Sequence, residues 1–272
     1  YEILPSDWSS DVCSSDLHFA TTITPSLYMN LQETHFSLNG LSYQVVPGIP
    51  LNMGVNTDAA YDNMVNKFKW GGLEKNPNIY LDETSRRMIS TFRLYFSKLI
   101  DALIAEGKNE QAVTALEKIT SIAPDHIVHY GTDGILFARA YYRLGETEKG
   151  ETLIGEISQR LNANIDWYTR LSTVKMANSL PEIIYNNLNP LLLIASVYQQ
   201  YDKEKYRIMT DELLQRAQAF YIQGVSYPGD VILQELTNRS IRSYYATSQE
   251  DTASLSRSEE HTSELQSLGR IS

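Results

Sequence analysis

The first periodic pattern along the chain is an alternation of apolar and polar residues between positions 36 and 45. The apolar positions are Phe36, Leu38, Leu41, Tyr43 and Val45. Asn39-Gly40 interrupts the alternation, and this dipeptide is typical of the tight turn between two antiparallel strands. The second strand of the hairpin is expected to end before Pro47. The pattern predicts a small N-terminal β-hairpin element within residues 18–55.

From Asn56 the apolar spacing changes to that of amphipathic helices. The first predicted helix starts at a cap on Thr57 or Asp58 and is closed by Gly71-Gly72. Its apolar positions are Ala60, Met64, Val65 and Phe68. A longer helix follows, capped by Asp82, with a stripe formed by Met88, Phe92, Phe96, Leu99 and Leu103. Gly107 separates it from another amphipathic helix that ends before Pro124, so a helical hairpin is predicted here.

The hairpin pattern recurs 38 residues further on, where Gly145 aligns with Gly107. The matched positions are Ala102 with Ala140, Glu110 with Glu148, Ala112 with Gly150 and Leu116 with Ile154. This offset is close to the helix–turn–helix unit of about 34 residues in tetratricopeptide repeats. Small residues at the crossing let the two helices of such a unit approach closely. Four positions depart from the repeat pattern, so the repeats are degenerate: Ile100, Ile119, Gly134 and Asn162.

A third helical region, residues 189–221, predicts another pair of helices with a looser turn near Tyr201-Asp202, and the tail after it is weakly patterned. The predicted fold is mainly α, an α-solenoid of degenerate tetratricopeptide-like hairpins with the small β element before it. The predicted helical repeat domain covers residues 56–256.

The two ends of the chain lack periodic pattern and are related to each other through their coding DNA. One DNA coding of residues 257–267 has a reverse complement that encodes residues 7–17 without a mismatch. The shared DNA resembles a sequencing-library adapter, and such scars carry no fold information. We therefore interpret 1–17 and 257–272 as non-native and disordered, with 6–17 and 257–268 adapter-derived. The origin of residues 1–5 and 269–272 is unassigned.

Removing these ends changes the charge and the chemistry of the chain. The whole chain has a net charge of -10. The first seventeen residues contribute -4, from four acids and no base, and the last sixteen contribute -1, from three Glu and two Arg. Residues 18–256 therefore have a net charge of -5. This acidic balance argues against nucleic-acid binding. The sole cysteine, Cys13, falls in the first scar, so thiol catalysis and cysteine-based zinc sites are excluded between the ends. The longest apolar run, residues 190–198, is far shorter than the roughly 20 residues that cross a bilayer.

Candidate chemical groups are sparse. His126 and His129 have a spacing that could place two imidazoles on one helical face, but zinc needs three or four ligands, so we interpret them as loop residues. Asp82-Glu83 is explained by helix capping. We expect no catalytic residue, metal or cofactor in this fragment. Stacked hairpins would place four residues toward a groove, with plain solvated surface as the alternative: Asp101, Arg139, Tyr142 and Arg143.

One set of motifs resembles a known family. The motifs are Tyr61-Asp62-Asn63, Lys69-Trp70-Gly71-Gly72 and Tyr80-Leu81-Asp82-Glu83, and "HFATT" before them is similar to a strand of the same family. The sequence from His18 to about Tyr168 resembles the C-terminal soluble region of the bacterial domain-of-unknown-function 2723 family. Members of that family are polytopic membrane proteins related to protein O-mannosyltransferases.

The resemblance implies that catalysis takes place elsewhere in the parent protein, because the family's catalytic positions lie in a membrane part that precedes this region. It implies a non-catalytic, extracytoplasmic (periplasmic) module that contacts the parent membrane domain and an acceptor protein or peptide, while the parent is a glycosyltransferase. The motif residues are then structural. The fragment itself is expected to be soluble. Two alternatives stay open: a stand-alone tetratricopeptide-like peptide-binding protein, and an independent hydrolase or metalloenzyme, which the lack of a convergent polar cluster disfavours.

Overall fold

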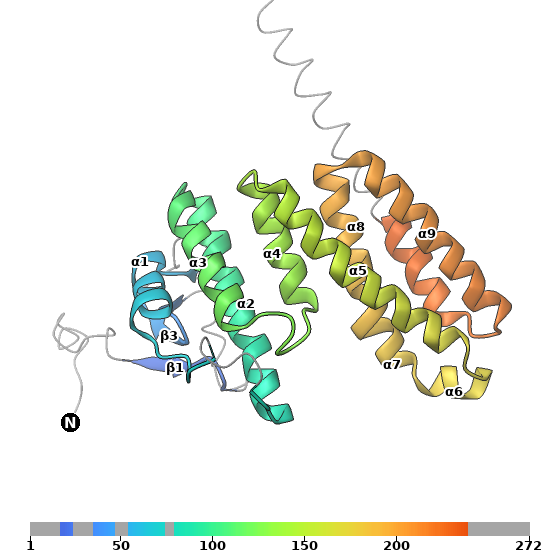
Figure 1. Ribbon diagram of the computed structural model, residues 1–272, viewed down its shortest axis with the longest axis horizontal. Helices are drawn as coiled ribbons and strands as arrows, with labels where there is room; N and C mark the ends of the chain where they lie inside the picture. Colours follow the sequence, from blue (N-terminus) through green and yellow to red (C-terminus); the bar gives the residue numbers. More distant parts are fainter. Residues whose placement is uncertain (1–16, 24–34, 47–53, 74–78, 239–272) are drawn as a thin grey trace, which may run out of the picture. The chain divides into compact units, whose positions relative to one another are not determined.

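The computed structural model describes residues 17–23, 35–46, 54–73 and 79–238. The predicted non-native segments, apart from Leu17, lie outside these residues. The described chain is mainly helical with a three-stranded antiparallel sheet near its N-terminus, which confirms the predicted fold class (Figure 1). It divides into two compact units, Tyr1–Gln159 and Arg160–Ser272, and each is described by itself.

The sheet contains the predicted hairpin and one further strand. Strands β2 (Phe36–Leu38) and β3 (Ser42–Val45) pair antiparallel, with Leu38 opposite Tyr43. Strand β1 (His18–Ala20) pairs with the other edge of β3, giving the order β1-β3-β2. Three of the five alternating residues, Phe36, Leu38 and Tyr43, are buried, and the rings of Phe36 and Tyr43 stack at 5.5 Å. Leu41 and Val45 are only partly buried.

The first helical segment is shorter and less regular than predicted. Helix α1 (Thr57–Tyr61) is capped by Asn56, whose side chain accepts a hydrogen bond from the Ala59 N–H, so the predicted cap is one or two residues late. A π-helix, η5 (Asp62–Lys67), continues it. Phe68 is already extended, so the helix ends well before Gly71. A π turn widens the helix by one residue, which a 3.6-residue pattern does not reveal.

Helices α2 (Glu83–Ala105) and α3 (Asn109–Ile122) form the predicted hairpin (Figure 1). Asp82 caps α2 as predicted, because its Oδ1 accepts from the Ser85 N–H at 2.7 Å. The turn ends at Gly107, whose φ of +76° suits glycine. Its N–H donates to the Ile104 carbonyl, and the Lys108 N–H donates to the Leu103 carbonyl, which is the paired pattern of a glycine C-cap.

Helices α4 (Thr132–Arg143) and α5 (Thr147–Thr169) repeat this hairpin, and α5 runs from the first unit into the second. Gly145 has a φ of +82°, and the Gly145 and Glu146 N–H groups donate to the carbonyls of Tyr142 and Tyr141. These are the same two bonds as at Gly107, shifted by 38 residues. The matched small and apolar positions of both hairpins are buried, namely Ala102, Ala140, Ala112, Gly150, Leu116 and Ile154.

The departure of Gly134 from the repeat pattern has a steric cause. A Cβ added at Gly134 would lie 2.5 Å from the Tyr130 Cβ and 2.8 Å from the Ile157 Cδ1. The Tyr130 side chain, which comes from the loop before α4, therefore takes the space that a large residue would fill at this position.

The second unit contains α6 (Thr173–Asn178), α7 (Leu180–Ile183), the π-helix η6 (Ile184–Leu188), α8 (Asn189–Tyr201) and α9 (Lys203–Ile222). Helices α8 and α9 are the predicted third pair, and the turn lies at the predicted place. Asp202 caps α9, since its Oδ1 accepts from the Lys205 N–H at 3.0 Å.

A further helix in the weakly patterned tail, residues 227–238, forms a hairpin with α9 that sequence reasoning missed. Gly224 has a φ of +74°, and the Gly224 and Val225 N–H groups donate to the carbonyls of Tyr221 and Phe220. Gly229 then lies under the Tyr221 ring as Gly150 lies under the Tyr142 ring.

The polar contacts of the two hairpins also match. The Tyr142 hydroxyl donates to Glu151, and the Tyr221 hydroxyl donates to Asp230. These pairs occupy equivalent positions 79 residues apart, so the α9 hairpin is a third copy of the same turn.

Candidate functional site

Three of the four predicted groove residues meet in one ion-pair cluster, which we call the Asp101 cluster: Asp101, Arg139 and Arg143. The Asp101 Oδ2 lies 2.6 Å from Arg139 Nη2, and its Oδ1 lies 2.7 Å from Arg143 Nη1. Arg139 and Arg143 are one turn apart on α4, so both reach the same carboxylate on α2. The cluster therefore joins the first helices of the first two hairpins.

The Asp101 cluster carries more positive than negative charge. Two guanidinium groups share one carboxylate, and the side chains of Arg139 and Arg143 are 33% and 29% exposed. Arg139 Nε is buried and has no hydrogen-bond partner among the described residues. The arrangement can hold an anion by charge-assisted hydrogen bonds, and it offers no nucleophile or proton-transfer pair.

Tyr142, the fourth predicted groove residue, differs from the prediction. It is only 8% exposed, and its hydroxyl donates to Glu151 on α5. The ring lies against Gly150 inside the α4–α5 hairpin, because only a small residue there leaves room for it. Tyr142 thus joins the two helices of one hairpin instead of lining an exposed groove.

The motif residues of α1 and η5 make contacts within this helical segment and with the turn of the β-hairpin. Tyr61 is the last residue of α1 and is partly buried. Asp62 pairs with Lys67 at 2.6 Å, and hydrogen bonds from Lys67 and Asn66 lower the pKa of its carboxyl group. The Asn63 amide donates to the Asn39 carbonyl at 2.8 Å and thereby holds the hairpin turn.

Trp70 is the centre of an aromatic cluster. Its ring lies 5.3 Å from that of Phe92 and 5.5 Å from that of Phe96, and its Nε1 donates to the Met64 carbonyl at 3.3 Å. Gly71 and Gly72 follow with φ values of +67° and +79°, which reverse the chain after the tryptophan. The neighbouring Lys69 is exposed, and no residue of this motif forms a catalytic arrangement with another among the described residues.

An open apolar cavity of about 510 Å³ lies beside Trp70. It is formed by the hairpin turn, the segment after η5, residues 79–81 and the first half of α2. Its lining includes Leu41, Phe68, Trp70, Leu81, Met88 and Phe92. Met88 and Phe92 belong to the predicted stripe of α2, but they face this cavity, while Phe96, Leu99 and Leu103 are fully buried.

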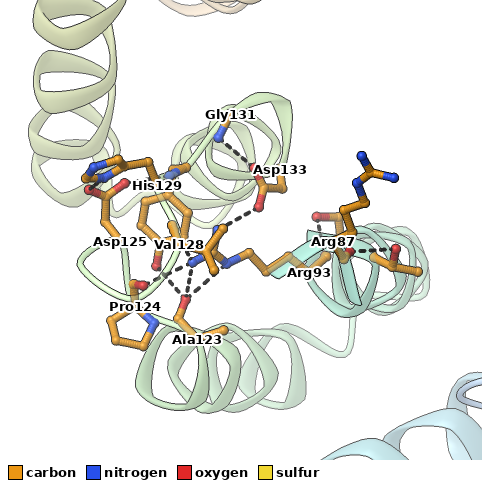
Figure 2. A network of polar contacts seen from close by, with 12 residues as sticks. Arg87, Arg93, Ala123, Pro124, Asp125, Val128, His129, Gly131 and Asp133 are labelled. Carbon is orange, nitrogen blue, oxygen red and sulfur yellow. Dashed lines mark hydrogen bonds and ion pairs between the residues drawn. The ribbon is translucent and has the colours of Figure 1, made fainter. Parts of the chain in front are cut away.

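Sequence reasoning missed Arg93, a fully buried polar residue of the first unit. Figure 2 shows its guanidinium reaching from α2 into the loop between α3 and α4. It donates to the carbonyls of Ala123, Pro124 and Val128 at 2.6–3.0 Å. Its Nη1 lies 3.0 Å from the Asp133 Oδ2, and the group stacks 4.3 Å from the centre of the Tyr130 ring.

This network is structural. Arg93 is fully buried, and the Ala123 and Pro124 carbonyls lie just after the C-terminus of α3, where a cation is favoured. Asp133 also accepts from the Gly131 N–H at 2.7 Å. The only sequence signal was an arginine between Phe92 and Phe96, within an otherwise apolar face.

The two predicted loop histidines lie in this same loop. His126 is exposed, and the His129 Nδ1 lies 3.1 Å from the Asp125 Oδ2. The other Asp125 oxygen accepts from the Tyr130 N–H at 2.6 Å. Within the described ranges, no three His, Cys, Asp or Glu side chains are grouped so that they could hold a metal ion.

Comparisons with known proteins give no identification. No protein-family model matches the chain, and neither a curated protein nor a solved structure matches it significantly. Among the helices of the described segments, none has both the length and the apolar character needed to span a membrane.

Proposed function

We propose that this chain is a non-catalytic protein-interaction module built from tetratricopeptide-like helical hairpins. One observation carries the proposal: Asp101 and Arg139 are in direct contact and stand at equivalent positions of successive hairpins. Equivalent faces of α2 and α4 therefore lie side by side, as they do in a stacked repeat array. Such a continuous face, with partly exposed charged side chains, suits the binding of an extended peptide.

The parent protein is proposed to be a membrane glycosyltransferase of the protein O-mannosyltransferase type, with this module on the extracytoplasmic side. The resemblance of the Tyr61–Gly72 and Tyr80–Glu83 motifs to the domain-of-unknown-function 2723 family supports this part. The structural contacts of Asn63, Trp70 and Asp82 agree with motifs that maintain a fold. The partners are the membrane part of the parent and an acceptor protein or peptide.

Binding can be tested on the full chain with three fluorescein-labelled peptide sets that are rich in Glu, rich in Lys or apolar. We expect saturable binding of at least one set, which chemical cross-linking places on α2 or α4. If no set binds, or if cross-links form only outside these helices, the proposed module is wrong.

The parent can be tested by sequencing DNA upstream of His18 after the adapters are trimmed. Many hydrophobic spans in the same reading frame would support the membrane glycosyltransferase. A frame without such spans would contradict it and favour the stand-alone peptide-binding protein.

A further inference from the structure

The charge of the Asp101 cluster is opposite to that of the whole chain. The chain has a net charge of -10, yet two arginines meet a single aspartate at this point of the α2–α4 face. Because Asp101 neutralises only one of the two guanidinium groups, one positive charge remains uncompensated within the cluster.

The two arginines of the Asp101 cluster also have N–H donors that make no hydrogen bond within the described part of the chain. Each guanidinium has five N–H donors, and each uses one nitrogen on Asp101. Neither arginine makes another side-chain hydrogen bond within the described part of the chain. The arginines also differ from Arg93, which is fully buried and donates to three carbonyls and a carboxylate. All three side-chain nitrogens of Arg93 thus donate within the fold, while Arg139 and Arg143 retain unused nitrogens and partial exposure.

We propose that the Asp101 cluster binds acidic peptide segments, with a partner's carboxylate held by Arg143 and Arg139 in competition with Asp101. The inference rests on the proposed interaction module and names its ligand class. The planar fork of an arginine matches the two oxygens of a carboxylate, which gives both charge and geometric selectivity. Asp101 holds the arginines in place and limits the affinity, because an incoming carboxylate must share their donors.

The first test measures fluorescence anisotropy of a fluorescein-labelled Glu-rich peptide with the full chain. A Lys-rich peptide of the same length is the control ligand. We expect the Glu-rich peptide to bind more tightly, and its affinity to fall as NaCl is raised, because salt screens partly exposed charges. Arg143→Ala is expected to weaken binding about tenfold, which is typical of one charge-assisted contact, and Arg143→Lys less.

A matched control separates this site from bulk charge. Arg207→Ala makes the same change in net charge on α9, where Arg207 pairs with Glu204 and Asp211. It should leave the affinity for the Glu-rich peptide unchanged. Equal weakening by Arg207→Ala and Arg143→Ala would show non-specific attraction and overturn the proposal.

Asp101→Asn supplies the sharpest discrimination. It removes the competing carboxylate, so the Glu-rich peptide should bind several-fold more tightly even if the variant melts at a lower temperature. A purely structural ion pair predicts no gain in affinity, and that result would contradict the inference. If the Glu-rich peptide fails to bind while apolar or Lys-rich peptides bind, this inference fails and the module stands. If no peptide binds, the proposed module fails as well.

Discussion

Arg93 on α2 and Asp133 on α4, forty residues apart, form a buried ion pair whose Nη1–Oδ2 distance is 3.0 Å. Removing Arg93 leaves the buried Asp133 carboxylate uncompensated and deprives the loop carbonyls of their donor. Arg93→Met should therefore lower the free energy of unfolding by about 3–5 kcal/mol. Urea denaturation followed by circular dichroism measures this change.

Arg87→Met on the same helix is the control for the Arg93 substitution. Arg87 pairs with Glu83 in solvent, with side chains 79% and 78% exposed, so we expect a change within about 0.5 kcal/mol. Comparable losses for both variants would contradict the structural role of the buried network. If Arg93→Met does not fold, Asp133→Asn provides a milder perturbation of the same pair.

Gly134 and Gly155 are both helical glycines in the first unit, but they should respond oppositely to alanine. Gly134→Ala pushes a methyl group into the Tyr130 side chain and should destabilise the fold by about 1–3 kcal/mol. Gly155 has open space around its Cα, so Gly155→Ala should add about 0.5–1 kcal/mol through helix propensity. Thermal unfolding of the two variants checks both signs, and stabilisation by Gly134→Ala would refute the steric explanation.

If the α9 hairpin is equivalent to the α4–α5 hairpin, alanine at Gly150 and at Gly229 should destabilise the fold in the same way. An added Cβ would lie 3.1 Å from the Ala138 carbonyl oxygen at Gly150, and 2.9 Å from the Ala217 carbonyl oxygen at Gly229. Both Gly150→Ala and Gly229→Ala should therefore reduce the unfolding temperature, because the two helices of each hairpin must separate. A loss for only one variant would argue against equivalence of the hairpins.

Alkaline pH should destabilise the first unit through two tyrosines. Burial raises the pKa of Tyr95 to about 12, helped by a hydrogen bond with Tyr43, and burial raises the pKa of Tyr130 to about 12 despite the opposing charge of Arg93. The folded protein then holds these protons more tightly than the unfolded chain. Their contribution is fully present below pH ~10, the unfolded pKa, and is lost as the pH rises to about 12.

Denaturation between pH 8 and pH 12, combined with tyrosinate absorbance, measures this loss. Tyr95→Phe and Tyr130→Phe should each reduce the dependence of unfolding free energy on pH above 10. Tyr80→Phe is the control, since that ring is 91% exposed. An unchanged slope in both buried-tyrosine variants would exclude them as the cause.

Local signals in the sequence predicted much of the fold. Asn39-Gly40, Asp82 and Gly107 act through their own backbone geometry, so their effects can be read without knowledge of distant contacts. The predicted register placed four residues toward one groove, and three of them, Asp101, Arg139 and Arg143, are in contact in the structure. Binding at the α2–α4 face depends on how exposed its side chains are and on the chemistry of the partner. A pattern of residue types along the chain gives neither.

The missed features depend on contacts between distant segments. Arg93 is buried in a helix face that pattern reasoning reserves for apolar residues, because the loop carbonyls it satisfies come 30 to 35 residues later. Tyr142 was expected to face the groove. Its contact with Glu151 was missed because that contact depends on the small size of Gly150. The third hairpin escaped because its offset is 79 residues rather than 38, although Tyr221, Gly224 and Gly229 repeat the earlier spacing.

The contact between Asp101 and Arg139 also has a consequence for duplication of the hairpins. Because the two residues occupy the same position of successive units, duplicating the α2–α3 hairpin in place would set one aspartate against another. Duplicating the α4–α5 hairpin would likewise set arginine against arginine. The pair of opposite charges thus disfavours a chain that is lengthened by copying either hairpin next to itself.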